Sequence, residues 1–307
     1  MNSKDYWITR EREHMERMMK LDKDRAAEIK RIYERTMTEV QKEIDRFYSV
    51  YAGKENIDME EARKRVSKHD VQAFQDKAKE YVKNKDFSPR ANQELRLYNS
   101  TMKINRLELL KSNIGLELVA MSDAEYKSVI GYLKQQIRAE FRRQAGILGM
   151  TVIRNEKLVN QIVNASFYNA TFSDRIWNNQ TELKAQLDKL LTNGLVQGKN
   201  PRELARGLRK EFGVSEYNAE RLMITELGRV QTASQKAAYE EYDISQYQFL
   251  AEIDACPDCS DLDGRIFDVK DMQSGVNANP IHSRCRCSTA AHVDRKAWEA
   301  DLTARGL

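Results

Sequence analysis

The stretch from Asp5 to Tyr51 contains neither proline nor glycine, and this limits what the first part of the chain can form more than any other feature. Apolar side chains recur along it in steps of three and four residues. They are Ala26, Ile29, Tyr33, Met37, Val40, Ile44, Phe47 and Tyr51. This spacing lines one side of an α-helix with apolar groups. It predicts one long amphipathic helix whose stripe packs against a neighbour, either in this chain or in a partner protein.

Capping signals indicate further helices after a break at residues 52–56. The predicted helix starts are Asp58 with Glu61, Ser88 with Pro89, and Ser122 with Glu125. The first and third pairs resemble capping boxes, and the second joins an N-cap serine to a proline at the first helical position. We expect one helix to run from Ser88 toward Met121 and the next from Ser122 to about Ala145, where glycines end it.

Shorter elements are expected between residues 155 and 250. Helical spacing covers residues 173–191, and Asn200 with Pro201 opens a helix that Gly213 is expected to stop. Residues 215–241 form another predicted helix, and 247–250 form the first predicted strand. The fold class that follows is mainly α, with long N-terminal amphipathic helices, a helical middle and a small C-terminal α+β module. We expect two regions, at residues 1–150 and 151–307.

The composition of the chain limits the compartments in which the protein can reside and the partners that it can bind. Charged residues make up 32% of the chain and hydrophobic ones 41%, which is typical of helices with solvated faces. Because 51 basic residues are balanced by 47 acidic ones, the net charge of +4 does not favour a duplex-binding surface. The polar N-terminus lacks the apolar core of a signal peptide, and no apolar run reaches the roughly 20 residues that span a bilayer. We therefore expect a protein of the reducing cytosol without membrane contact, where clustered cysteines are more often metal ligands than disulfides.

All four cysteines lie in two close pairs near the C-terminus. Cys256 and Cys259 form a Cys-x-x-Cys turn, and Cys285 and Cys287 follow after a gap that includes His282, three residues before Cys285. Two sulfurs on one turn, joined by a second pair or by a His-x-x-Cys unit, supply four ligands to one tetrahedral ion. Mixed thiolate and imidazole ligands favour zinc. We predict a structural Zn²⁺ site that is closed to substrate, because protein groups fill all four positions.

Five candidate ligands compete for these four positions. Cys256 and Cys259 are the strongest candidates, His282 and Cys285 follow, and Cys287 can replace either of the last two. Free thiols or a disulfide are the alternatives, whereas a redox Cys-x-x-Cys normally starts a helix in a βαβ unit, which the sequence does not indicate. An Asp-Gly turn at 263–264 leads into a predicted strand at 265–267. The zinc knuckle is therefore expected on a short hairpin within residues 250–290, as a module that unfolds without its ion while the N-terminal helices stay folded.

Sequence motifs of known catalytic sites are missing or incomplete. The chain contains no His-Glu-x-x-His, no phosphate-binding loop and no Gly-x-Ser-x-Gly elbow. His14 and Glu16 match one fragment of the zinc-deaminase signature, but they lie about 240 residues before the first cysteine pair, which also lacks the expected preceding proline. Glu226 can be read as a general base, yet it lies on a predicted helix rich in Lys, Arg and Glu. We therefore predict no catalytic residues and expect that the protein is not an enzyme.

The metal-binding segment resembles that of the phage Mu F-like minor head proteins, also called phage head morphogenesis proteins. The residues that carry the resemblance are Cys256-Pro-Asp-Cys259, Leu262-Asp-Gly264, Phe267, Pro280-Ile-His282, Cys285-Arg-Cys287, and upstream Ser173-Asp-Arg-Ile176-Trp177, Gly198–Leu204, Thr225-Glu226, Ala233 and Ala237. The resemblance covers roughly residues 150–290. Departures are Asn279 where the family commonly has proline, Ser283 where proline often follows the histidine, and Ile224 where an arginine usually precedes the Thr-Glu pair. The first two leave the metal ligands intact, and the third weakens a catalytic interpretation of that helix.

The resemblance implies a low-copy structural protein of the virion, inside the head and near the portal vertex, and in the host cytoplasm during assembly. It implies roles in head assembly and in DNA packaging or ejection. Residues 1–150 are then expected to dock on the portal protein or another partner, and 151–307 to form the Mu F-like domain. The major capsid protein, a scaffolding protein and packaged DNA are further expected partners, and no small-molecule substrate is expected.

Two alternatives remain open at this point. The first is a nucleic-acid-binding zinc knuckle that contacts packaged DNA through Arg284 and Arg286. The second is a toxin-like or modifying enzyme, since some relatives carry this domain beside effector domains. Only 20 residues follow Cys287, which we take as too few for an appended catalytic domain.

Overall fold

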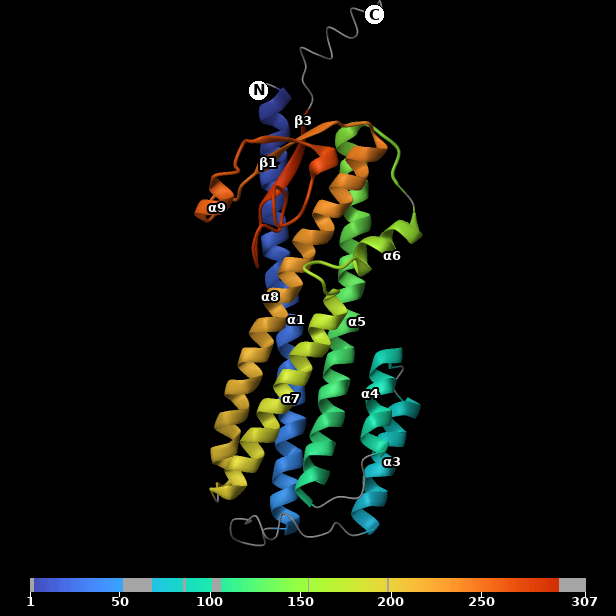
Figure 1. Ribbon diagram of the computed structural model, residues 1–307, viewed down its shortest axis with the longest axis vertical. Helices are drawn as coiled ribbons and strands as arrows, with labels where there is room; N and C mark the ends of the chain where they lie inside the picture. Colours follow the sequence, from blue (N-terminus) through green and yellow to red (C-terminus); the bar gives the residue numbers. More distant parts are fainter. Residues whose placement is uncertain are drawn as a thin grey trace, which may run out of the picture. The chain divides into compact units, whose positions relative to one another are not determined.

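The long N-terminal helix predicted from the sequence is present. The computed structural model describes residues 3–51, 68–84, 87–100, 106–153, 155–197 and 199–292. Helix α1 spans Ser3–Tyr51 (Figure 1). Its predicted stripe is buried at Ile29, Tyr33, Val40, Ile44 and Phe47. The predicted helix start at Asp58 and Glu61 lies outside the described residues.

Seven further helices and three strands follow in the described part of the chain. The helices are α3 (Lys68–Asn84), α4 (Pro89–Ser100), α5 (Arg106–Leu148), α6 (Glu156–Asn164), α7 (Phe172–Val196), α8 (Pro201–Glu241) and the single turn α9 (Pro257–Ser260). The strands are β1 (Gln246–Leu250), β2 (Ile266–Asp268) and β3 (Ser288–His292), and a 3-10 turn, η1, spans Val269–Asp271. None of the described helices combines the length and the apolar character that crossing a membrane requires.

Two predicted helix boundaries are wrong because burial outweighs local signals. Ser122 and Glu125, read as a capping box, lie inside α5 and are buried. Gly213, read as a stop, lies inside α8. A glycine within a helix costs about 1 kcal/mol relative to alanine, less than the gain from burying the neighbouring Phe212 side chain.

The expectation of one helix from Ser88 toward Met121 is also wrong, because α4 ends at Ser100 and α5 begins at Arg106. The remaining helix boundaries follow the sequence signals. Asn200 caps α8 as expected: its side chain accepts the Glu203 N–H at 3.1 Å, and the Glu203 carboxylate accepts the Asn200 N–H at 2.9 Å. This reciprocal pair satisfies two N–H groups that the helix itself cannot. Ser88 caps α4 by accepting the Ala91 N–H at 3.3 Å. Gly149, with φ +68°, follows the end of α5 in the left-handed conformation that favours glycine.

The chain divides into two compact units, each built from separated segments. Unit 1 comprises Met1–Ala26, Val129–Phe172 and Arg221–Leu307, and unit 2 comprises Ala27–Ser128 and Ser173–Glu220. Helices α1, α5 and α8 therefore contribute to both units. The predicted division at residue 150 into a docking region and a family domain concerns function, and it stays a prediction.

Unit 2 is a helical assembly with an apolar core. Residues of α3, α4, α5 and α7, with Phe87 just before α4, form one cluster there: Phe74, Ala78, Phe87, Ala91, Leu95, Leu116, Val119 and Trp177. Helices α7 and α8 approach closely because each places a glycine under a leucine of the other. A Cβ on Gly194 would lie 2.4 Å from Leu204 Cδ2, and one on Gly207 would lie 2.5 Å from Leu190 Cδ1. Only glycine permits this spacing without displacing the leucines.

A buried carboxyl group makes unit 2 sensitive to pH. Glu125 of α5 accepts a hydrogen bond from the Tyr33 hydroxyl of α1 at 2.8 Å, and Asn179 of α7 donates to the same hydroxyl at 3.0 Å. Burial raises the pKa of Glu125 to about 7, although the hydrogen bond from Tyr33 lowers it. The folded protein therefore holds this proton more tightly than the unfolded chain does. Its contribution to stability is full below pH 4.5 and is lost as the pH rises through 7.

We expect Glu125→Gln to remove this pH dependence. A neutral amide keeps an oxygen for Tyr33 and carries no charge to desolvate, so the variant should gain about 3 kcal/mol over the parent at pH 8 and little at pH 5. Urea unfolding at the two pH values measures the difference, with Glu182→Gln on the exposed face of α7 as the control. Equal pH slopes for parent and Glu125→Gln would contradict the assignment.

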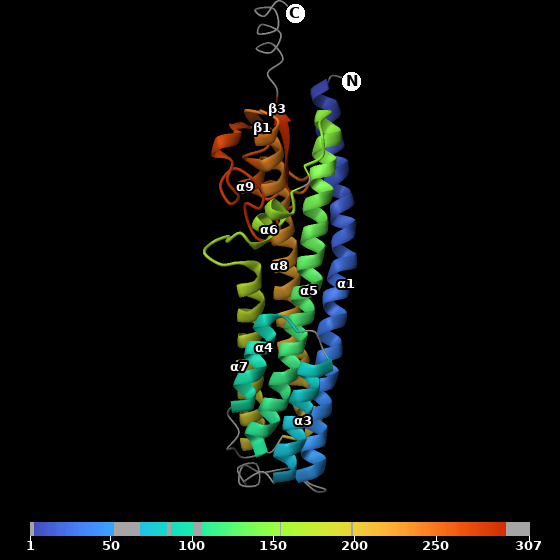
Figure 2. The same cartoon turned by 90° about the vertical axis from the view of Figure 1, so that its right-hand side faces the viewer.

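Unit 1 holds the three strands in one antiparallel sheet of order β2-β1-β3. The predicted strand at 247–250 is β1, and the predicted strand at 265–267 corresponds to β2. Strand β3 was not predicted. In Figures 1 and 2 the sheet lies beside the C-terminal part of α8, where Tyr239 and Tyr247 share a core with Val269, Met272 and Ala278. The expected mainly helical fold with a small C-terminal α+β part is confirmed, with three strands where a single hairpin was predicted.

Candidate metal centre

The connection between β1 and β2 supplies the first cysteine pair. Cys256 precedes the one-turn helix α9 with extended backbone angles, Pro257 occupies its first turn, and Cys259 lies inside it. The Ser260 N–H bonds to the Cys256 carbonyl at 2.9 Å, so the turn holds both cysteines at one end of the loop. Gly264, with φ +75°, and the Asp263 side chain, which accepts the Ala251 N–H at 2.8 Å, return the chain to β1. The first cysteine pair therefore lies on the predicted β1–β2 hairpin, whereas His282, Cys285 and Cys287 come from outside it, so the prediction that one hairpin carries the whole cluster is wrong.

The loop before β3 supplies the other three predicted ligands. The Cys285 N–H bonds to the His282 carbonyl at 3.1 Å, which forms a second tight turn. Helix α8 contacts this loop and holds its backbone, since the Thr225 hydroxyl accepts the Arg284 N–H at 3.1 Å. A Cβ on Gly228 would lie 2.8 Å from the Asn279 side chain, so this position of α8 must stay small for the loop to approach.

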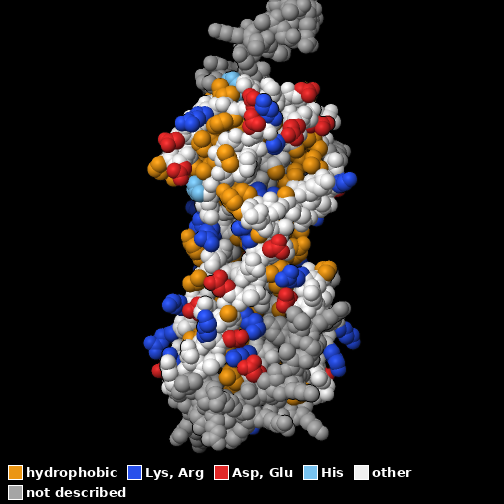
Figure 3. Space-filling view, in the orientation of Figure 1, with side chains coloured by type: hydrophobic (Ala, Val, Ile, Leu, Met, Phe, Trp, Pro, Cys, Tyr) orange, Lys and Arg blue, Asp and Glu red, His pale blue; other side chains and the backbone are white. Residues whose placement is uncertain are grey.

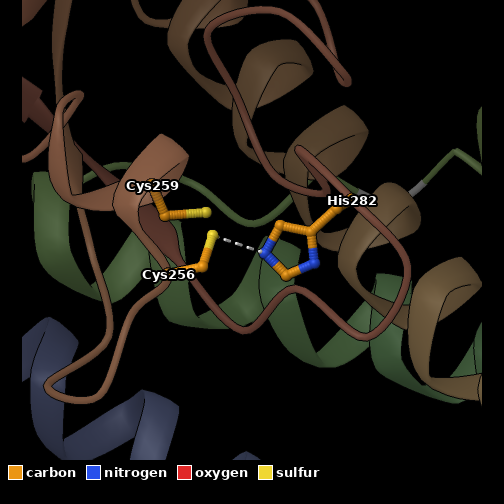
Figure 4. Close-up of side chains that lie close together, drawn as sticks. All are labelled: Cys256, Cys259 and His282. Atoms are coloured by element: carbon orange, nitrogen blue, oxygen red, sulfur yellow. Dashed lines mark hydrogen bonds between the residues drawn. The ribbon is translucent and has the colours of Figure 1, made fainter.

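The five predicted donors come together as two overlapping groups. Cys256, Cys259 and His282 form one, and Cys259, Cys285 and Cys287 form the other, with ligand atoms within 4.8 Å of one another in each. Figure 4 shows the first group, in which the His282 ring points at the sulfurs of the Cys256–Cys259 turn. Cys256 Sγ lies 3.2 Å from His282 Nε2, and Cys259 Sγ lies 3.8 Å from Cys285 Sγ. The cluster can therefore hold a metal ion.

The geometry suits a tetrahedral ion with sulfur ligands. Zinc–sulfur bonds of about 2.3 Å place two sulfurs of a tetrahedron about 3.8 Å apart, which is the Cys259–Cys285 separation. The His282 imidazole ring is oriented with Nε2 toward the cysteine sulfurs. His282 Nδ1 lies 2.8 Å from the Ser283 carbonyl, which can only accept, so Nδ1 carries the proton and Nε2 presents its lone pair toward Cys256.

The thiols are buried to different depths and do not ionise independently. Cys259, Cys285 and Cys287 are buried beside Phe249 and Ala251, and Cys256 is partly exposed. The hydrogen bond from Cys287 lowers the pKa of Cys285 to about 5, and the same bond raises the pKa of Cys287. Burial raises the pKa of Cys259. A cation at the centre of the group favours the thiolate form of every cysteine that binds it.

The two arginines predicted to contact nucleic acid lie within this loop. Arg286 forms an ion pair with Asp22 of α1, and its side chain is only 11% exposed. Arg284 has φ +62°, and its backbone is held by Thr225. The nucleic-acid role of both residues stays a prediction, and the ion pair gives Arg286 a structural role.

Residues considered for catalysis have structural partners. Glu226 is 1% exposed and accepts a hydrogen bond from Arg229 at 2.6 Å. Arg229 also donates to the carbonyls of Ile162 and Val163 at the end of α6, so the pair anchors that helix. His14 lies 3.6 Å from Glu140 of α5.

Comparisons with known proteins bear on the family. Residues 185–290 match the family model described as Phage Mu protein F like protein, which confirms the resemblance seen in the sequence over this segment. The matched segment includes all five candidate ligands. The family is one of phage head morphogenesis proteins, and such a family implies a place in the virion. No solved structure matches the chain.

A second comparison corrects the expectation that the protein is not an enzyme. The chain is 26% identical over 230 residues to NAD(+)–arginine ADP-ribosyltransferase EFV of Enterococcus faecalis, which is an enzyme. The alignment covers 66% of this chain and 46% of that protein, so the chain spans less than half the length of the relative. The chain lacks the catalytic motifs named above, but the absence of those motifs does not exclude an activity that has a different sequence signature.

Proposed function

We propose that the protein is a phage minor head protein, a low-copy structural component near the portal vertex that acts in head assembly and in DNA packaging or ejection. The family match over residues 185–290 is the observation that carries this proposal. Long helices with charged outer faces suit docking on the portal protein, and the major capsid or scaffolding protein is a further partner. The protein would reside in the host cytoplasm during assembly and inside the head afterwards.

We also propose that the cysteine cluster holds one structural Zn²⁺. Its thiolate and imidazole donors favour zinc over harder cations, and the separation of Cys259 and Cys285 fits a tetrahedral zinc site. With four protein ligands the ion has no open position, and its role is to tie the β1–β2 connection to the loop before β3.

We expect the purified chain to contain one zinc per molecule, measured by elemental analysis together with a protein assay. We expect co-expressed portal protein from the same phage to retain the tagged chain on an affinity column at physiological salt. The major capsid protein, expressed the same way, tests whether retention is specific. Absence of stoichiometric metal would remove the zinc proposal, and failure of the portal protein to retain the chain would remove the portal proposal.

The nucleic-acid alternative finds less support in the charges around the centre. Residues 251–272 carry seven acidic side chains and two basic ones, and Figure 3 shows acidic and basic side chains interspersed with hydrophobic ones over this part of the molecule, without a continuous basic patch. Binding through phosphates needs basic groups and weakens steeply with salt. A DNA affinity that falls steeply between 50 and 200 mM salt, roughly the range that tests such contacts, would revive the alternative.

ADP-ribosyl transfer to arginine is a second candidate function, favoured by the similarity to the Enterococcus faecalis enzyme. The test is incubation of the purified chain with NAD⁺ and an arginine acceptor, followed by measurement of nicotinamide release and of acceptor mass. A gain of one ADP-ribose on the acceptor would support the activity. An unchanged acceptor, beside a control transferase that modifies it, would remove it.

A further inference from the structure

In the segment that carries the last two cysteines, successive side chains face two different environments in turn. Cys285 and Cys287 belong to the metal-binding group, while the residues after each of them, Arg286 and Ser288, contact α1. In extended backbone, successive side chains point to opposite sides. The same short segment therefore has one side toward the metal centre and the other toward α1.

Arg286 reaches an acidic residue that is itself buried. Asp22 of α1 is 7% exposed, and the ion pair leaves the side chains of Arg286 and Asp22 only 11% and 10% exposed. An arginine in such a place needs an acidic partner, because an unpaired buried charge is strongly destabilising. Asp22 thus fixes the position of the residue between Cys285 and Cys287.

Ser288 reaches a second acidic residue of α1. Its hydroxyl donates to Glu11 Oε1 at 2.6 Å, and the Gln231 and Gln235 side chains of α8 donate to the Ser288 hydroxyl at 3.0 and 3.2 Å. Ser288 is 1% exposed and Glu11 3%. Glu11 and Asp22 are eleven residues apart, close to three full helical turns, so they lie on the same side of α1.

We infer that Asp22 and Glu11 are positioning residues of the metal centre. Asp22 pairs with Arg286 and Glu11 accepts a hydrogen bond from Ser288, and these contacts hold Cys285 and Cys287 in the geometry for Zn²⁺. This rests on the proposed zinc site and extends it to a helix more than 230 residues away in sequence. Groups that orient metal ligands without touching the ion typically contribute 10- to 100-fold to affinity. The metal in turn stabilises the docking of α1, since the linkage is reciprocal.

The test uses the full chain and two variants of α1. Zn²⁺ affinity is measured by competition with a chromogenic chelator, and ligand geometry by the absorption spectrum of the Co²⁺-substituted protein. We expect Asp22→Asn to bind Zn²⁺ about 10-fold more weakly than the parent and to show altered Co²⁺ d–d bands. Asp24→Asn, an exposed aspartate on the same helix, should match the parent in both measurements.

A double variant guards against simple misfolding. Asp22→Asn leaves Arg286 buried without its partner, whereas Asp22→Asn with Arg286→Met removes both charges and should fold. We expect the double variant to show the same weaker affinity and altered spectrum. If the parent binds no Zn²⁺, the zinc proposal fails and this inference falls with it. If the parent binds Zn²⁺ and the folded double variant matches it in affinity and spectrum, the inference alone is overturned.

Discussion

Cys259→Ser is expected to abolish metal binding and to unfold the sheet of unit 1. Cys259 belongs to both ligand groups in the described part of the chain, and its side chain is buried, so its loss takes one sulfur from each group. A structural zinc ion contributes on the order of 10 kcal/mol to the folding of a small domain, comparable to the whole stability of many domains at about 5–15 kcal/mol. Elemental analysis and hydrogen exchange of the amides in β1 and β3 measure the two effects.

The loss of structure in Cys259→Ser is expected to extend to the N-terminal part of α1. The sequence predicted an independent module at 250–290, but the structure joins Arg286 and Ser288 to Asp22 and Glu11. Hydrogen exchange should therefore rise in residues 8–26 as well, and stay unchanged in α3 and α4 of unit 2. Ser260→Ala, beside Cys259 on the exposed side of the same turn, is the control. A Cys259→Ser protein that retains one zinc and parental exchange would contradict the ligand assignment.

The sequence predicts the helices well and their ends less well. The period of apolar residues in α1 survives in the structure because the buried stripe is what stabilises the helix. The capping box at Ser122 and the stop at Gly213 failed for one reason: each signal is worth about 1 kcal/mol. Burial of an apolar neighbour, Met121 beside Ser122 and Phe212 beside Gly213, outweighs each signal, and which residues are buried is not visible from the nearby sequence.

The metal centre shows the same division between local and distant information. The spacing of four cysteines and one histidine located all five candidate ligands, because both turns are local structures. The supporting residues Asp22, Glu11, Thr225 and Gly228 were missed, since their roles arise from contacts across more than 50 residues. One local signal was present in the sequence. The alternation Cys-Arg-Cys-Ser indicates an extended segment with two different sides, and this segment leads directly into β3.

Arg143→Met is expected to cost unit 1 about 3–5 kcal/mol, the usual cost of breaking a buried ion pair. Arg143 of α5 donates to both carboxylate oxygens of Glu11 and, at 2.8 and 2.6 Å, to both oxygens of Glu140. Burial raises the pKa of Glu11 in spite of this pairing. Without Arg143, two buried carboxylates repel each other at neutral pH. The measure is the free energy of opening of β3 amides by hydrogen exchange, because β3 begins at Ser288, which Glu11 holds.

Two further variants separate lost charge compensation from lost packing. Arg142→Met, on the exposed side of the same helix, should change stability by no more than about 0.5 kcal/mol. Adding Glu11→Gln and Glu140→Gln to Arg143→Met should recover most of the loss, because neutral amides leave no unpaired charge in the core. The cost of Arg143→Met alone should also shrink at acidic pH, where protonation removes the carboxylate charges that Arg143 balances. A pH-independent cost that the glutamines do not relieve would mean that Arg143 acts through its packing, and that the charges of Glu11 and Glu140 are not what it balances.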